Sequence, residues 1–247
     1  MKTLLANGLL LTWPAFLWAA EPQPAPAPKP AGPQVTIVLG LRHGHVIPHR
    51  EGCNHTGGGN VDVAQPTPDT VVITMTGVCV AYAHPFKDSA VSMDFDLEQV
   101  FDIVFEAPDV KRAKLTIEGR VIGLLRTHCK GHGTASEGPA HAAVTCCDTE
   151  IVALDLPAHS VAGGENLSIN DHAGPVTVPV GAGKHILLEK INIMAANAHN
   201  LKLCKAASAE FAPDPALDPL WISYWEPFHG ANKKDFGFQI TLKVAPE

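Results

Sequence analysis

From Val91 to Phe105, apolar and polar side chains alternate with a period of two residues. The odd positions carry Val, Met, Phe, Leu, Gln, Phe, Ile and Phe, and most even positions carry Ser, Asp or Glu. Successive side chains of a β-strand point to opposite faces of its sheet, so this pattern is typical of a strand with one dry face. The segment therefore predicts a sheet that is buried on one side.

A short helix is the alternative for the second half of this segment. Between Leu97 and Phe105 the apolar residues also recur at i, i+3, i+4, i+7 and i+8, and Asp96 with Gln99 matches a capping box. A strand of fifteen residues is also unusually long. We favour a bent or bulged strand, or two successive strands, because the alternation begins well before a helix could. One short helix near residues 97–105 remains the alternative.

Further short apolar runs follow one another along the chain, separated by turn residues such as Gly163-Gly164, Gly174-Pro175 and Gly181-Ala182-Gly183. About ten to thirteen strands without alternating helices predict an all-β fold, an antiparallel β-sandwich or jelly roll. The other expected strands are Val35–Leu41, Thr70–Tyr82, Ala113–Leu125 with a break near Glu118-Gly119, Glu150–Leu156, Leu167–Asn170, Val176–Val180, His185–Met194, Leu201–Cys204, Trp221–Trp225 and Phe236–Val244.

The N-terminal residues predict export. Residues 1–20 combine Lys2 with a mostly apolar stretch from Leu4 to Trp18, which is typical of a signal peptide; an uncleaved anchor is the alternative. Residues 21–33 alternate Pro with Ala and polar residues, which favours a semi-rigid polyproline spacer. We expect a secreted, periplasmic or cell-surface protein whose folded domain spans residues 34–247, with a subdivision near residues 157–165 as the alternative.

Composition excludes two classes of partner. The chain has 18 Lys and Arg against 25 Asp and Glu, a formal net charge of −7, and 46% hydrophobic residues. An acidic balance is the opposite of the basic patch that nucleic-acid binding requires, and it disfavours anionic membrane surfaces. We expect a folded domain with no nucleic-acid partner and no membrane insertion of the mature domain.

Six cysteines lie in the folded part, and an even number in an exported chain indicates disulfide bonds. Adjacent cysteines rarely bond to each other, so the neighbouring pair is expected to join one loop to two different places. The disulfide candidates are Cys53, Cys79, Cys129, Cys146, Cys147 and Cys204.

The first group of histidines lies at residues 42–60, in R-H-G-H-V-I-P-H-R-E-G-C-N-H-T-G-G-G-N. Imidazole binds Zn and Cu, and His-x-His on a strand places both rings on one side. The alternative is a polar loop with solvated histidines. An H-x-H near a Gly-rich, Cys-containing loop resembles the copper-site region of Cu/Zn superoxide dismutases, but the sequence contains no second matching ligand region, so no residue role follows. The metal candidates here are His43, His45, His49 and His55.

The second group lies between two apolar runs, in T-H-C-K-G-H-G-T-A-S-E-G-P-A-H-A-A-V-T-C-C-D. It contains the ligand types of a structural zinc site, but in an oxidising compartment its thiols are expected in disulfides instead. If the two groups met in space, a histidine-lined Cu or Zn site would follow. The metal candidates here are His128, His132 and His141.

Two further groups have an ordinary structural explanation beside a functional one. The carboxylates Asp94, Asp96, Glu98 and Asp102 share one strand face, where clustered acids can bind Ca²⁺ or transfer protons, but the wet side of a sheet explains them better. Trp221, Ser223 and Trp225 would point the same way on a strand and could present an aromatic platform to a sugar ring or a protein; core packing is the alternative.

No common enzyme motif occurs in the sequence: it lacks G-x-S-x-G, H-E-x-x-H, a phosphate-binding Gly-Lys loop and a dinucleotide fingerprint. We therefore expect an exported binding or structural module without catalytic residues or a cofactor, whose ligand is a carbohydrate or a cell-surface protein. The alternatives are a histidine-rich Cu- or Zn-binding protein and, with less support, a hydrolase without a recognisable motif.

Overall fold

The alternating segment forms one uninterrupted strand, β4 (Ser89–Phe105). Its odd positions from Val91 to Ile103 are buried, including Gln99, and its even positions from Ser92 to Val104 are half-buried. The prediction of β structure is confirmed, whereas the version with two successive strands is wrong because β4 is continuous; the pairing irregularity lies in β1, between Leu39 and Arg42. The alternative of a short helix near residues 97–105 is wrong, because burial follows a period of two through the whole segment.

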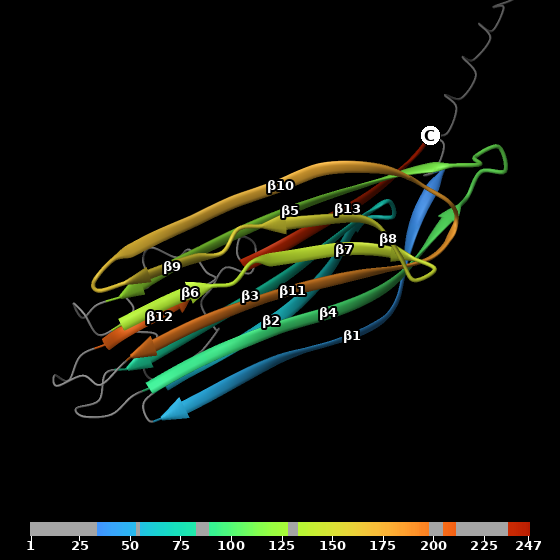
Figure 1. Cartoon of the computed structure of the whole chain (residues 1–247). Coiled ribbons are helices and arrows are strands. Elements are labelled where there is room, and N and C mark those ends of the chain that lie inside the picture. The colour runs from blue at the N-terminus through green and yellow to red at the C-terminus, as the bar shows by residue number, and fades with distance from the viewer. Residues whose placement is uncertain (1–33, 53–54, 83–88, 128–132, 198–204, 211–236) are drawn as a thin grey trace, which may run out of the picture. The chain divides into compact units, whose positions relative to one another are not determined.

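The computed structural model describes residues 34–52, 55–82, 89–127, 133–197, 205–210 and 237–247 (Figure 1). In this part of the chain there is no helix, and hence no helix that could span a membrane. The other strands are β1 (Val35–Gly52), β2 (His55–Thr67), β3 (Thr70–Tyr82), β5 (Ala113–Thr127), β6 (Gly133–Glu137), β7 (Ala140–Cys146), β8 (Thr149–Leu156), β9 (His159–Ala162), β10 (Asn166–Val180), β11 (Gly183–Asn197), β12 (Lys205–Glu210) and β13 (Gly237–Pro246).

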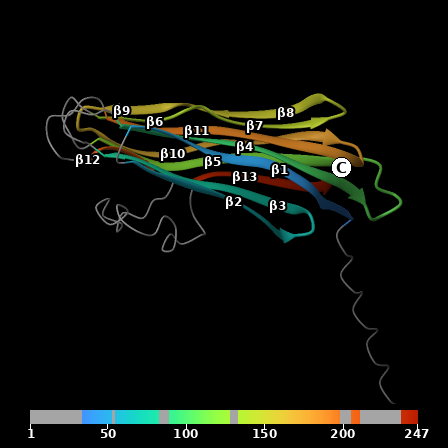
Figure 2. The ribbon, with the colours of Figure 1, turned by 90° about the horizontal axis from the view of Figure 1, so that it is seen from below.

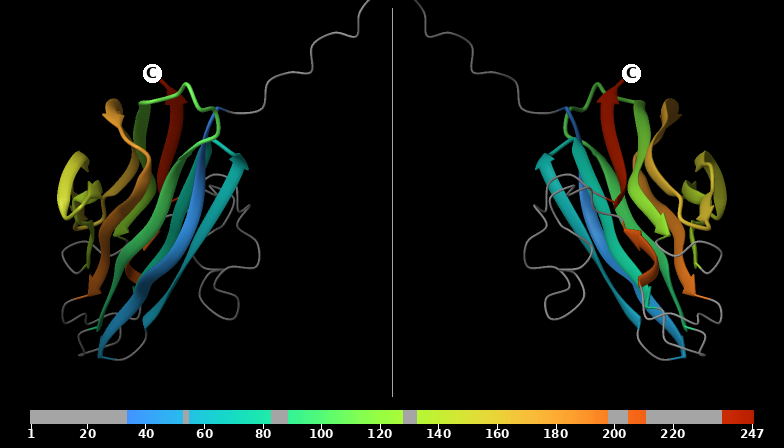
Figure 3. Two further views of the ribbon diagram at one scale, coloured as in Figure 1. Left: turned by 90° about the vertical axis from the view of Figure 1, so that its right-hand side faces the viewer. Right: turned by 90° about the vertical axis from the view of Figure 1, so that its left-hand side faces the viewer.

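These strands form two antiparallel sheets, as predicted. Sheet A has the order β1-β4-β11-β6-β9, and β7 pairs with β11 and with β8. Sheet B has the order β10-β5-β12-β3-β13, with β2 paired to β3 and β13 paired to β5 as well as to β3. The fold of the described residues is therefore all-β and sandwich-like, with β4 and β11 in one layer and β3 and β13 in the other (Figures 2 and 3).

The inner faces of the two sheets share one hydrophobic core. Met93, Phe95 and Phe101 enter it from β4 in sheet A, and Met75 and Phe238 enter it from β3 and β13 in sheet B. Each of these side chains is at most 2% exposed. Pro33–Glu247 belongs to one compact unit.

Two glycines in sheet B make room for an aromatic ring from sheet A. Gly59 on β2 and Gly77 on β3 are directly paired. A Cβ added at Gly77 would lie 2.5 Å from Cζ of Phe95, and one added at Gly59 would lie 2.8 Å from the same atom. The Phe95 ring therefore fills a notch that only glycine leaves open, and this contact brings the two sheets close together.

Two predicted interruptions are wrong for a common reason. The expected break near Glu118-Gly119 is absent, because β5 continues through it with Gly119 facing the core, where an added Cβ would lie 3.1 Å from Cδ1 of Ile240. The expected turn at Gly174-Pro175 is instead a β-bulge within β10. In both places glycine permits a close approach inside a strand rather than ending one.

Several strands are not predicted from the sequence because they lack long runs of β-branched residues. β2 contains three successive glycines, β7 is rich in alanine, and β6, β9 and β12 are short. Turns at Gly163-Gly164 and after Val180 are confirmed. The predicted strands at Leu201–Cys204 and Trp221–Trp225 lie outside the described residues.

The edge strands β1 and β2 tie the two sheets together along one side. The backbone N–H of Ile37 donates to the Pro68 carbonyl at 2.7 Å, and Gln65 Nε2 donates to the Ile37 carbonyl at 2.6 Å. Farther along β1, Arg42 Nη1 donates to the Val61 carbonyl at 3.3 Å. These contacts use donors and acceptors that an edge strand otherwise leaves open.

Replacing Gly77 with Ala is expected to destabilise the protein by about 1–3 kcal/mol, because the added methyl group overpacks against the Phe95 ring. The measurement is chemical denaturation of the full chain. A matched change, Gly181→Ala, adds a methyl group where no atom lies within 4 Å and is expected to change stability little.

A Phe95→Leu change in the Gly77→Ala background tests the cause, because the smaller side chain relieves the clash. The double variant is expected to lose less stability than the sum of its two single changes. If the stability losses of the two single variants simply add in the double variant, direct packing of the Phe95 ring against Gly77 is contradicted.

Candidate functional site

Three of the four histidines of the first group, His43, His45 and His49, lie beside the acidic positions of β4. His43 is paired with Glu98 and His45 with Asp96, so each imidazole lies beside a carboxylate on the same face of sheet A. His49 Nε2 lies 2.9 Å from the Oδ2 atom of Asp94. Two groups that the sequence presents separately are therefore cross-strand neighbours on the outer face of sheet A.

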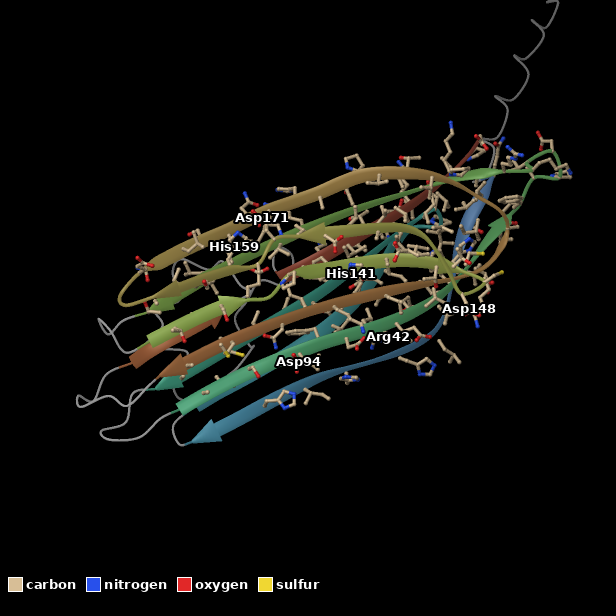
Figure 4. All side chains as sticks on the ribbon, viewed as in Figure 1. Arg42, Asp94, His141, Asp148, His159 and Asp171 are labelled. Carbon is tan, nitrogen blue, oxygen red and sulfur yellow. The ribbon has the colours of Figure 1, made fainter. Side chains whose placement is uncertain are left out.

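One row of charged side chains continues across five strands of sheet A. His45 on β1, Asp96 on β4, Lys190 on β11, His141 on β7 and Asp155 on β8 occupy successive paired positions. Lys190 Nζ lies 3.5 Å from Asp96 Oδ2, and His141 Nδ1 lies 2.8 Å from Asp155 Oδ1. Figure 4 labels Asp94 on β4 and His141 on β7, with β11 between them.

The two histidine groups share a sheet face but do not meet through their described members. His45 and His141 are separated by β4 and β11, which places them roughly 14 Å apart, because neighbouring strands lie about 4.8 Å apart. Within the described ranges, no group of three or more His, Cys, Asp or Glu side chains is arranged to hold a metal ion. The side chains of His55, His128 and His132 lie outside the described part.

An apolar patch adjoins the charged row on the same outer face. On β1, Leu41 is 73% exposed and Val38 is 50% exposed. Val100 on β4 is paired with Ile186 on β11, and Leu188 follows two residues later on the same face. We call these five residues the apolar patch. Exposed apolar side chains rimmed by charge are typical of interaction sites.

Three of the six cysteines are described, and none of them is in a disulfide bond. Cys79 points into the core, where its Sγ atom lies 3.7 Å from the Ile193 carbonyl, and burial, with a smaller contribution from Asp94, raises the pKa of its thiol to about 12. Cys146 and Cys147 lie at the β7–β8 hairpin with their Sγ atoms 3.9 Å apart. Cys53, Cys129 and Cys204 lie outside the described residues, as does the expected aromatic platform of Trp221, Ser223 and Trp225.

Two buried carboxyl groups were missed by the sequence interpretation. Glu189 on β11 is fully buried, and burial raises the pKa of its carboxyl group to about 8. Glu137 on β6 is 1% exposed, and burial together with the nearby charge of Asp171 raises its pKa to about 8. Neither carboxyl group has a hydrogen-bond partner among the described residues. The sequence position of Glu189 predicts its burial, because Glu189 continues the core-facing alternation of Leu187, Ile191 and Ile193 on β11.

Glu137 belongs to a small acid–histidine–acid cluster. His159 on β9 lies between the two carboxyl groups, with Nδ1 3.6 Å from Glu137 Oε2 and Nε2 3.3 Å from Asp171 Oδ2 on β10 (Figure 4). β9 belongs to sheet A and β10 to sheet B. The cluster therefore places titratable groups where the edges of the two sheets come together.

Comparison with known proteins finds no matching family model, no matching curated protein and no matching solved structure. The functional proposal therefore rests on the geometry of the chain itself.

The stability of the protein is expected to fall as the pH rises from about 5 to 8. The folded-state pKa of Glu189 lies above its ordinary value of 4.5, so over this range the unfolded chain loses a proton that the folded chain keeps. The stabilising contribution is full below pH 4.5 and is lost by about pH 8. It amounts to several kcal/mol, because one pKa unit corresponds to about 1.4 kcal/mol.

The measurement is the free energy of unfolding against pH for the wild type and for Glu189→Gln, whose side chain stays neutral. The variant is expected to show a flatter profile between pH 5 and 8, whereas Glu98→Gln, a change on the outer face, is expected to keep the wild-type slope. Equal slopes for the wild type and Glu189→Gln would contradict a buried neutral carboxyl group.

Proposed function

We propose that this chain is an exported, non-catalytic β-sandwich module that binds another surface protein through the outer face of sheet A. The observation that carries the proposal is the apolar patch beside the row of His, Asp and Lys side chains on one sheet face. Within the described residues no helix lies over this face. Of the two ligand classes expected from the sequence, a protein fits an extended mixed face of this kind.

The charges on this face favour a basic partner. β4 contributes the carboxylates of Asp94, Asp96, Glu98 and Asp102, and β11 contributes Lys184 and Lys190. Only Asp96 forms an ion pair with a lysine within the described residues. A partner that presents Lys or Arg around an apolar centre would complement both the charged row and the apolar patch. Such charge complementarity increases the rate and the specificity of association.

The described polar contacts of four histidines are with carboxylates and with one backbone carbonyl. His49, His141 and His159 lie next to carboxylates, and His185 Nδ1 lies 2.9 Å from the Gly183 carbonyl. Within the described residues, no histidine is hydrogen-bonded to a Ser, Thr or Cys side chain that it could activate as a nucleophile.

The proposal includes the export and disulfide expectations. The signal-like residues 1–20 and the spacer 21–33 support a chain in the periplasm, at the cell surface or outside the cell. The even number of cysteines supports disulfide bonds that involve Cys53, Cys129 and Cys204, because Cys79, Cys146 and Cys147 are unbonded. A jelly-roll arrangement of the two sheets is the form of sandwich that we favour. The aromatic platform of Trp221, Ser223 and Trp225 remains a second proposed contact surface, supported by its sequence alone.

The alternative function is that of an exported Cu- or Zn-binding protein. It is supported by the placement of His43 and His45 on one sheet face, directly opposite Glu98 and Asp96. Metal binding would require these four side chains to rearrange, because the structure does not arrange them to hold an ion.

Metal analysis of untagged protein tests this alternative. It predicts stoichiometric Cu or Zn that is lost in the His43→Ala/His45→Ala double variant and kept in His172→Ala, which removes an exposed histidine from sheet B. Protein without stoichiometric metal would contradict it.

The binding proposal predicts a specific cross-link from the outer face of sheet A. Purified chain carrying the photo-cross-linking residue p-benzoylphenylalanine in place of Ile47, which is 41% exposed, is added to cells of the source organism and illuminated. A single discrete adduct is expected. The same residue in place of Ala64, an exposed position on β2 of sheet B that does not line the groove described below, is expected to give none.

Charge reversal provides the second control. Glu98→Lys combined with Asp102→Lys is expected to abolish the adduct by repelling a basic partner, whereas Asp62→Lys on sheet B is expected to leave it. No adduct, identical adducts from positions 47 and 64, or an adduct insensitive to the double charge reversal would contradict the proposal.

A further inference from the structure

A polar groove of about 370 Å³ lies on the outer face of sheet B, on the sheet opposite the proposed protein-binding face. Its side chains come from β5, β10 and β13: Glu118, Arg120, His172, Pro175, Gln239 and Thr241 line it. None of these residues takes part in the contacts described for sheet A.

The groove exists because β10 departs from regular pairing. Ala173 is paired with Gly119 and Val176 with Ile117, so Gly174 and Pro175 together stand opposite the single residue Glu118. Gly174 has a φ of +87°, and an added Cβ would lie 2.8 Å from the Ile117 carbonyl oxygen. Only glycine fits this bulge, and the bulge raises one wall of the groove beside Glu118.

The side chains on its floor form a regular array. Arg120 on β5 is paired with His172 on β10 and with Gln239 on β13, and Glu118 is paired with Thr241. Paired Cβ atoms lie about 5 Å apart, and Glu118 and Arg120 lie about 7 Å apart along β5. A carboxylate, a guanidinium, an imidazole, an amide and a hydroxyl therefore converge over an area comparable with one sugar ring.

Two of these groups are fixed in place while most of their bonding capacity remains free. Arg120 donates from Nε and Nη2 to Asn170 Oδ1 at 3.2 and 3.1 Å, which leaves three of its five N–H groups. Gln239 Nε2 donates to Thr74 Oγ1 at 3.3 Å, which leaves its carbonyl oxygen. Glu118 has no hydrogen-bond partner among the described residues.

This combination of free acceptors and donors suits a neutral diol. A carboxylate accepts two hydroxyl protons at once, and a guanidinium donates to two oxygens at once, so each can engage hydroxyl groups on neighbouring carbons. The Glu118 carboxylate disfavours phosphate or sulfate, and the polar lining disfavours an apolar ligand. We propose that this groove binds a carbohydrate through a vicinal diol of one sugar ring, with Glu118 and Arg120 as the principal contacts.

The test is amide chemical-shift titration of the ¹⁵N-labelled full chain with methyl glucoside, methyl mannoside, methyl galactoside and N-acetylglucosamine. At least one sugar is expected to shift the amides of residues 117–120, 172–176 and 239–241 in a saturable manner. Glu118→Gln and Arg120→Gln are each expected to weaken that binding at least tenfold. Glu98→Gln on sheet A is expected to leave it unchanged.

A second pair of probes tests the diol itself. Cyclohexane-1,2-diol is expected to shift the same amides, and cyclohexanol is not. The proposal is overturned if no sugar produces saturable shifts in these residues, if inorganic phosphate or glycine shifts them in place of sugars, or if the two Gln variants bind as the wild type does. Failure here leaves the cross-linking test on sheet A unaffected, because the two surfaces lie on different sheets.

Discussion

The burial of every second side chain between two facing sheets is the constraint on which the other features depend. In β4 the odd positions must enter the core, where Phe95 fills the notch left by Gly59 and Gly77. The even positions are then forced outward, and the antiparallel pairing with β1 fixes which residues they meet. The row of His and Asp side chains is thus a consequence of core packing, because a shift of one residue would turn every one of these side chains inward.

Not every position obeys this division, and the exceptions are informative. Glu189 and Glu137 occupy core-facing positions, where an ionised carboxylate without a partner would be strongly unfavourable. The raised pKa of each group shows how the structure accommodates them: both carboxyl groups stay protonated near neutral pH. The stability of the hydrophobic core therefore depends on pH through these two buried carboxyl groups, separately from the charged side chains on the protein surface.

Local sequence patterns correctly predict those features that depend only on residues close together in the chain. The period-two alternation correctly predicts a strand, and the His-x-His spacing correctly predicts that His43 and His45 share one face. The pairing of these histidines with Asp96 and Glu98 depends on contacts across more than 50 residues, which no local pattern encodes. For the same reason the glycines at positions 119 and 174 predict breaks in the sequence, whereas in the structure Gly119 allows close packing and Gly174 allows a bulge between distant strands.

The central claim is that the outer face of sheet A is open in the isolated chain and covered by a partner where the protein acts. Hydroxyl-radical footprinting of the chain, first alone and then bound to cells of the source organism, tests it most directly. We predict oxidation of Leu41 and Ile47 but not of Phe95 or Leu97 in the isolated chain, and protection of Leu41 and Ile47 on cells. Oxidation of the inward residues, or equal oxidation of the outward residues in both states, would contradict it.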